Sequence, residues 1–250
     1  MEAEVCILVH GFTGSPVEIR PLARALNESG YRVLTPLLPG HEGTKEDLRK
    51  ATASAWIHSI EELVDAHIGP TPVHLIGFSM GAMIASVIAS KKPVTSLTLL
   101  APSVYYARPR QVFRQMATYI KANWDKAGND ADYLKRRGDQ FLTAPFYSLQ
   151  QFRRLVQMAK SAMPQIQMPT CVIQGLKDEI VEPQSADYVY NTIASAHKEV
   201  HYLPESRHMV CLDVEAEMAV NLVLKFLGSQ SSGLPSASLD HTNSNDDTPE

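Results

Sequence analysis

Short apolar runs alternate with helical patterns along this chain of 250 residues, and no other feature restricts its fold as strongly. Most runs are continuously apolar and end in turn residues, which is typical of strands buried on both faces of a parallel sheet. The predicted strands are Val5 to Val9, Arg32 to Thr35, Val73 to Ile76, Leu97 to Leu100, Cys171 to Gln174 and Glu199 to Tyr202. The predicted helices are Val17 to Ser29, Thr52 to Ala66, Met80 to Ser90, Ser185 to Ile193 and Val214 to Leu227. This order predicts an α/β fold with helices on both faces of a mostly parallel sheet and with ligands at the carboxyl ends of its strands.

Two segments interrupt the alternation. Residues 103–164 carry helical patterns without a convincing strand, which predicts an inserted helical cap. Residues 228–250 are rich in serine and acidic residues and contain no lysine or arginine, a composition typical of a disordered tail. We therefore expect a core formed by residues 1–102 and 165–227, a helical cap and a tail.

Charge and cysteine content exclude several classes of protein. The formal net charge of -4 does not suit a nucleic-acid-binding protein, which needs a positive surface. Three scattered cysteines, without a C-x-x-C pair or the histidine spacing of a zinc site, predict buried reduced thiols and no metal. The sequence has neither a leader peptide pattern nor 18 consecutive apolar residues, so we expect a cytoplasmic protein without a transmembrane segment. Its oligomeric state is not indicated.

The segment Gly77-Phe78-Ser79-Met80-Gly81 fits the pattern G-x-S-x-G and lies where a predicted strand meets a predicted helix. A serine at such a sharp turn is held in a strained backbone, and flanking glycines avoid collisions with neighbouring segments. The helix N-terminus also directs N–H groups toward an oxyanion formed there. Ser79 is therefore the candidate nucleophile, and the alternative is a glycine-rich turn without catalytic function.

At this point the chain resembles the α/β-hydrolases, specifically their small carboxylesterase and monoacylglycerol lipase group. The motifs that carry the resemblance are G-F-S-M-G, the oxyanion-loop motif His10-Gly11-Phe12-Thr13-Gly14, and Gly30-Tyr31 followed by Pro36 to His41. The likeness covers about residues 4 to 228. It departs from the group's pattern at Glu42 and Arg207, where the group has glycine, and we expect Arg207 to point to solvent.

The resemblance implies an α/β-hydrolase fold and a Ser-His-Asp catalytic triad. His208 follows the last predicted strand in a loop, whereas His41 precedes the nucleophile and is expected to order its own loop. Asp178 lies just beyond a strand and completes the chain order Ser, Asp, His. Glu179 and Glu182 are close competitors for the role of the acid.

The resemblance further implies a serine esterase that forms an acyl-enzyme on Ser79 and needs no cofactor. The backbone N–H groups of Phe12 and Met80 would form the oxyanion hole. The substrate would be a small-molecule carboxylic ester, with monoacylglycerols as one candidate. Apolar cap positions either line an acyl pocket or bury the cap against the core: Phe113, Met116, Tyr119, Ile120, Phe152, Leu155 and Met158.

Other functions stay open because a fold does not specify its substrate. The same scaffold suits a thioesterase, an aminopeptidase or a carbon-carbon bond hydrolase, and it also suits a catalytically silent ligand receptor. The segment Val104 to Pro164 holds 11 of the 23 lysines and arginines and 4 of the 27 acidic residues. This basic excess fits solvated helix faces, attraction of anionic or interfacial substrates, or an interaction module.

Overall fold

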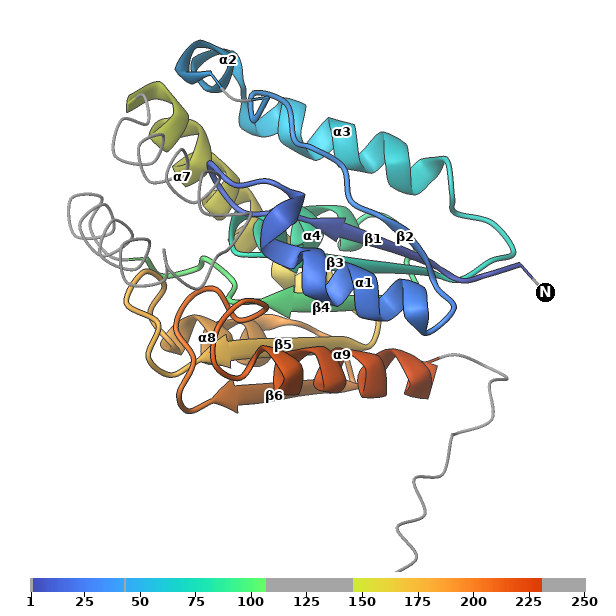
Figure 1. Cartoon of the computed structure of the whole chain (residues 1–250). Coiled ribbons are helices and arrows are strands. Elements are labelled where there is room, and N and C mark those ends of the chain that lie inside the picture. The colour runs from blue at the N-terminus through green and yellow to red at the C-terminus, as the bar shows by residue number, and fades with distance from the viewer. Residues whose placement is uncertain (1, 43, 107–145, 231–250) are drawn as a thin grey trace, which may run out of the picture.

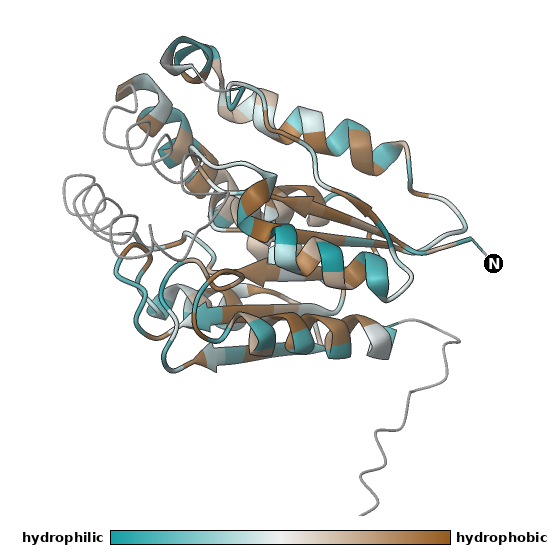
Figure 2. Cartoon of the chain, in the orientation of Figure 1, coloured by the Kyte–Doolittle hydropathy of each residue, from teal (hydrophilic) through white to brown (hydrophobic). Residues whose placement is uncertain are grey.

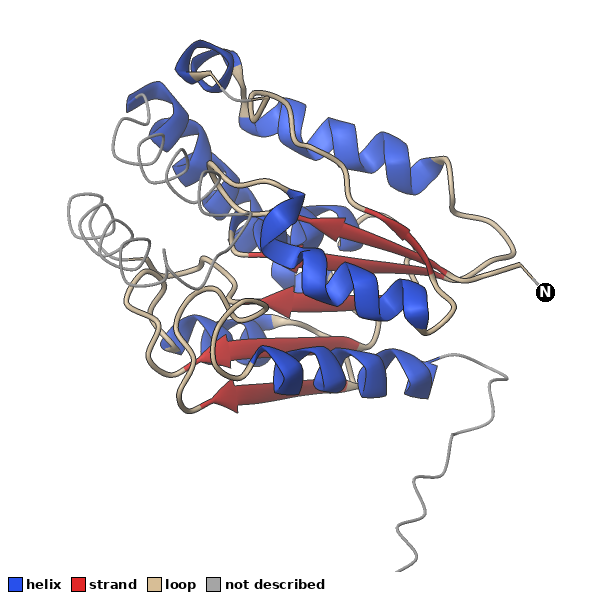
Figure 3. Ribbon diagram, viewed as in Figure 1, coloured by secondary structure: helices blue, strands red, loops and turns tan. Residues whose placement is uncertain are grey.

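The protein folds around a six-stranded sheet in which every pairing of neighbouring strands is parallel, with the order β2-β1-β3-β4-β5-β6 (Figure 3). The computed structural model describes residues 2–42, 44–106 and 146–230. The strands are β1 (Val5–Val9), β2 (Arg32–Leu34), β3 (Val73–Phe78), β4 (Ser96–Leu100), β5 (Thr170–Gly175) and β6 (Lys198–Leu203). All six predicted strands, and with them the predicted fold class, are confirmed.

Helices cover both faces of this sheet (Figure 1). One face carries α1 (Arg20–Glu28) and α9 (Ala216–Gln230), and the other carries α3 (Ala53–Asp65), α4 (Met80–Ala89), α7 (Phe146–Ala162) and α8 (Gln184–Thr192). Three short elements complete the described part of the chain: η1 (Pro16–Ile19), α2 (Lys45–Lys50) and η4 (Met163–Gln165). The sequence predicted neither α2 nor η4, because a helix of one or two turns has too few residues to show a period.

Each face of the sheet has its own hydrophobic core, since successive side chains of a strand point to opposite faces. In β1, Cys6 and Leu8 pack in the cluster under α1 and α9, whereas Val5, Ile7 and Val9 pack in the cluster under the other helices. All five are buried. This two-sided burial explains the continuous apolar runs, which stand out in Figure 2 along the central strands.

Helix α7, the C-terminal part of the predicted cap, packs against the body of the protein. Its buried side chains, among them Leu155 and Val156, belong to the core cluster that also contains α3 and α4. The Ser148 hydroxyl donates a hydrogen bond to the carbonyl of Leu48 at 2.9 Å. Position 148 is therefore fixed against the body by a polar contact, and positions 155 and 156 by apolar burial. Two further predicted cap helices, within residues 107–145, lie outside the described residues.

The C-terminal helix extends past the predicted start of the tail at Gly228. α9 continues to Gln230 because Phe226 and Leu227 are buried and anchor its last turns. The Ser229 hydroxyl donates to the carbonyl of Phe226 at 2.6 Å and closes the final turn. Residues 231–250 lie outside the described part. Within the described ranges, no helix combines the length and apolarity needed to cross a membrane.

Candidate active site

The predicted nucleophile Ser79 sits in a strained turn between β3 and α4. Its backbone has φ 55° and ψ -113°, a conformation that costs about 1 to 3 kcal/mol in a residue with a side chain. A Cβ on Gly81 would lie 2.1 Å from the carbonyl oxygen of Val9, and one on Gly77 would lie 2.4 Å from that of Gly81. The two glycines are thus required for the close approach of β1, β3 and α4 that holds the turn.

The structure brings the predicted acid and base to this serine. The Ser79 Oγ lies 2.9 Å from Nε2 of His208, and the His208 Nδ1 lies 2.8 Å from Oδ2 of Asp178. All three residues are buried, with exposed fractions of 8%, 4% and 7% for Ser79, His208 and Asp178. The competing carboxylates Glu179 and Glu182 are exposed and are not the partners of the imidazole.

The hydrogen bonds around Asp178 fix the orientation of its carboxylate. Oδ1 accepts from the backbone N–H groups of Ile180 and Val181, both at 2.9 Å, and Oδ2 accepts from the Gln174 side-chain amide at 3.0 Å. Because the carboxylate is an acceptor, the proton of the His208 imidazole resides on Nδ1. Nε2 is then the lone-pair nitrogen and accepts the hydrogen bond from the serine hydroxyl.

Acidic side chains shape the loop that carries His208. The Ser206 hydroxyl donates to Oε2 of Glu215 at 2.8 Å, and the Arg207 backbone N–H donates to Oδ2 of Asp213 at 2.6 Å. The side chain of Arg207 is exposed, as predicted. The loop therefore presents the imidazole inward while the neighbouring cation points away from it.

The proposed oxyanion donors lie at the carboxyl end of β1 and at the start of α4. Phe12 is buried in the loop after β1, and Met80 is the first residue of α4. The buried carboxylate of Glu18 accepts the Gly11 backbone N–H at 2.9 Å, and a Cβ on Gly14 would lie 2.1 Å from Oε2 of Glu18. Glu18 was not predicted, because a glutamate at the start of a helical segment is ordinarily exposed and only the fold buries this one.

Two histidines connect the oxyanion loop to the loop after β2. The Leu38 backbone N–H donates to Nε2 of His10 at 3.1 Å, and the Thr13 backbone N–H donates to Nε2 of His41 at 3.1 Å. The His41 Nδ1 donates to the carbonyl of Pro39 at 3.2 Å. Burial lowers the pKa of His41 to about 4, so the ring is neutral near pH 7 and its Nε2 accepts. His41 therefore orders the loop after β1, the candidate oxyanion loop, as well as its own loop.

A second hydroxyl lies against the nucleophile. Ser103, in the loop after β4, places its Oγ 3.0 Å from the Oγ of Ser79 and is itself buried. Ser103 was not predicted, because no motif marks a serine at this position and only the fold brings it next to Ser79.

An aromatic wall borders the oxyanion loop. The Phe152 ring, on α7, stacks on that of Phe12 with 5.4 Å between ring centroids, and lies 5.0 Å from the ring of Tyr106. Phe152 is thus one predicted pocket residue that lies beside the candidate oxyanion hole. Phe152 and Leu155 are both buried members of the core cluster, and Met158 packs against it. The other predicted positions (Phe113, Met116, Tyr119 and Ile120) lie outside the described residues.

The parallel sheet, the strained serine after β3 and its hydrogen-bonded histidine and aspartate together define an α/β-hydrolase. A family model described as "Serine aminopeptidase, S33" matches residues 2–215, and the chain belongs to this family.

Individual relatives and solved structures agree with this family. The chain is 28% identical over 225 residues to a thermostable monoacylglycerol lipase of Bacillus sp. (strain H-257), covering 88% of each chain. It is 23% identical over 223 residues to a carboxylesterase of Bacillus subtilis (strain 168), covering 88% of this chain and 91% of the relative. A solved structure of the metagenome-derived lipolytic enzymes LipS and LipT has a TM-score of 0.72 at 22% identity, covering 92% of this chain and 95% of that one. This structural match concerns the fold.

Proposed function

We propose that this protein is a serine hydrolase that cleaves carboxylic esters of small molecules, monoacylglycerols among them, through an acyl-enzyme on Ser79. The observation that carries the proposal is the buried line of hydrogen bonds from Ser79 through His208 to Asp178, at 2.9 and 2.8 Å. Similarity to a monoacylglycerol lipase and a carboxylesterase supports ester hydrolysis. The catalytic roles, the oxyanion donors and a cap formed by residues 103–164 are parts of the same proposal.

The first half of the reaction forms the acyl-enzyme. Nε2 of His208 takes the Ser79 proton while Oγ bonds to the ester carbonyl carbon, and Asp178 stabilises the imidazolium. The negative charge that develops on the carbonyl oxygen is stabilised by the backbone N–H groups of Phe12 and Met80. As the tetrahedral intermediate collapses, His208 gives the proton to the departing alcohol.

The second half releases the acid. Nε2 of His208 takes a proton from water, the resulting hydroxide attacks the acyl carbon, and the same two N–H groups stabilise the second oxyanion. Collapse returns the proton to Ser79 and breaks its ester bond. The aromatic wall of Phe12 and Phe152 stands beside these donors, so we assign the acyl chain to this apolar surface.

Labelling with a serine-directed fluorophosphonate, followed by peptide mapping, tests the proposal together with a series of p-nitrophenyl esters from acetate through butyrate and octanoate to laurate. We expect a single modified residue, Ser79, and faster cleavage of the medium and long acyl chains than of acetate. Amino-acyl p-nitroanilides, offered in parallel, test the aminopeptidase activity that the family description names.

Each contrary result has a defined meaning. A label on a serine other than Ser79 contradicts the assignment of the nucleophile. Cleavage of the anilides without cleavage of any ester would identify a peptidase. No turnover of either substrate together with no labelling of Ser79 would contradict the proposal and favour a silent ligand receptor. A flat response to chain length would contradict the placement of the acyl chain against Phe12 and Phe152.

The direction of the hydrogen bond between Ser103 and Ser79 suggests a role for Ser103. Because the Ser79 proton is directed to His208, the hydrogen bond between the two serines must be donated by Ser103. A donor to Oγ favours the negative charge that develops there as the proton leaves. We therefore assign Ser103 a positioning role: it holds Oγ in line with the imidazole.

Ser103→Ala should lower kcat/KM for a p-nitrophenyl ester by about threefold to tenfold, the value of one neutral hydrogen bond. The loss should fall on kcat, because the contact acts on the reacting oxygen, and Ser103→Thr should restore most of it. Ser96→Ala is the matched control: it removes a buried hydroxyl at the opposite end of β4. An equal loss in both alanine variants, or a change in KM alone, would show a structural role only.

A further inference from the structure

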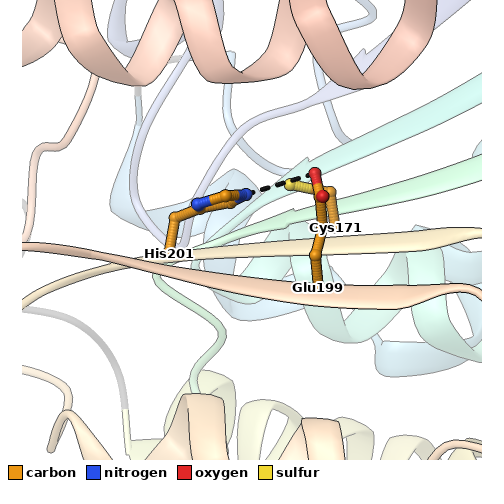
Figure 4. A group of neighbouring side chains, drawn as sticks. All are labelled: Cys171, Glu199 and His201. Carbon is orange, nitrogen blue, oxygen red and sulfur yellow. Dashed lines mark ion pairs between the residues drawn. The ribbon is translucent and has the colours of Figure 1, made fainter. Parts of the chain in front are cut away.

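Three side chains of types that can bind transition metals lie close together near the edge of the sheet, on strands β5 and β6 (Figure 4). Cys171 of β5 is paired in register with Glu199 of β6, and His201 lies two residues further along β6 on the same face. One ligand atom from each of the three residues lies within 4.8 Å of the other two. Nε2 of His201 is 3.2 Å from Oε1 of Glu199.

These distances are close to those of a metal coordination shell. Bonds of about 2.0 to 2.3 Å to a tetrahedral Zn²⁺ place neighbouring ligand atoms about 3.3 to 3.7 Å apart. The pair formed by His201 and Glu199, at 3.2 Å, lies just below this range. The sulfur atom of Cys171 lies within 4.8 Å of the other two ligand atoms and on the same face of the paired strands, so rotation of the side chains has to bring it into the shell.

The mixture of ligand types favours Zn²⁺ over the hard cations. Thiolate and imidazole ligands select zinc and related transition metals, whereas Mg²⁺ and Ca²⁺ require oxygen ligands. Cys171 is fully buried, but 31% of the His201 side chain and 45% of the Glu199 side chain are exposed. The ion therefore has a route from solvent, and a water molecule can supply the fourth ligand.

We propose that Cys171, Glu199 and His201 form a Zn²⁺ site that ties the edge strand β6 to β5. On binding, the metal ion replaces the thiol proton, which leaves to solvent, and the thiolate and carboxylate together balance the two positive charges. β5 leads to the loop that carries Asp178, and β6 leads to the loop that carries His208. The metal ion would therefore stabilise the pairing of the two strands that position the proposed acid and base. Cysteine and histidine spacing did not predict it, because the ligands meet only through the register of the two strands.

Cobalt(II) titration of the full chain, after dialysis against a chelator, tests the site directly. Co²⁺ bound to a thiolate absorbs in the near ultraviolet through charge transfer from sulfur, and four-coordinate Co²⁺ gives intense visible bands. We expect one Co²⁺ per chain with both signals, and we expect stoichiometric Zn²⁺ to abolish them. Zn²⁺ should also raise the Tm of the protein by a few degrees, since it binds the folded state.

Variants of the ligands separate this site from adventitious binding. Cys171→Ser should abolish the charge-transfer band, whereas Cys211→Ser, which changes another buried cysteine, should retain it. His201→Gln, on a partly exposed side chain, should weaken Co²⁺ binding by about tenfold or more while the protein stays folded. Less than one bound Co²⁺ per chain, absence of the charge-transfer band in the unmodified chain, or unchanged binding by Cys171→Ser or by His201→Gln would each overturn the proposal.

Discussion

Replacing Ser79 by alanine should lower kcat for ester hydrolysis by about 10⁶-fold, the loss typical of a serine hydrolase deprived of its nucleophile. Among the described residues, the neighbouring hydroxyl of Ser103 is not positioned to substitute. Ser103 lies 3.0 Å from the Ser79 Oγ, but it is Ser79 that makes the 2.9 Å hydrogen bond to Nε2 of His208. The measurement is the steady-state hydrolysis of p-nitrophenyl butyrate, together with fluorophosphonate labelling, which should disappear.

The variant should remain folded and should still bind its substrate. Alanine removes one oxygen atom from a side chain that is 8% exposed, and the backbone N–H of position 79 still donates to the carbonyl of Leu100 at 2.8 Å. Ser29→Ala, at an exposed serine after α1, is the control and should retain full activity and labelling. Hydrolysis by Ser79→Ala close to that of the unmodified protein would exclude this serine as the nucleophile and indicate a different one.

The sequence predicted the fold well because most strands are buried on both faces and therefore appear as continuous apolar runs. The least distinct prediction was β6, an edge strand whose residues are mostly half-buried and whose sequence mixes charged and apolar side chains. α2 escaped prediction because its six residues contain a single large apolar side chain, Leu48. The pattern of burial, more than intrinsic propensity, determined which elements could be predicted.

In the candidate active site, the sequence indicated the groups that we propose as catalytic but not the residues that position them. The order of Ser79, Asp178 and His208 along the chain is recognisable because each follows a predicted strand. Glu18, Gln174 and Ser103 follow no motif. Glu18 and Gln174 contact residues only seven and four positions away along the chain, but the fold of the backbone between them decides whether the side chains meet. Ser103 reaches Ser79, 24 positions away, only because β3 and β4 are neighbours in the sheet. Prediction of such residues needs the register of the strands and the path of each loop, which a linear pattern does not contain.

Asp178→Asn should lower kcat by about 10⁴-fold with little change in the fold, because it alters the tautomer of the base and leaves the shape of the site intact. The asparagine carbonyl oxygen can still accept from the N–H groups of Ile180 and Val181, as Oδ1 of Asp178 does. Its NH₂ group then faces Nδ1 of His208 and can only donate. Nδ1 becomes the acceptor, Nε2 carries the proton, and the base can no longer take the proton of the nucleophile.

The side chain of Gln174 can adapt to the asparagine, so the substitution should leave the fold intact. Nε2 of Gln174 donates to Oδ2 of Asp178 at 3.0 Å and to the carbonyl of Gly175 at 3.2 Å, and no described residue pairs with its buried Oε1. A rotation of the side-chain amide would let Oε1 accept from the new asparagine, with the loss of the hydrogen bond to Gly175. We therefore expect a near-normal Tm together with the loss of kcat for p-nitrophenyl butyrate. Glu179→Gln and Glu182→Gln are the matched controls, because each removes an exposed carboxylate within four positions of Asp178. Both variants should retain activity. A large loss in either control, with Asp178→Asn still active, would transfer the role of the acid to that glutamate and require the His208 ring to turn toward a different loop.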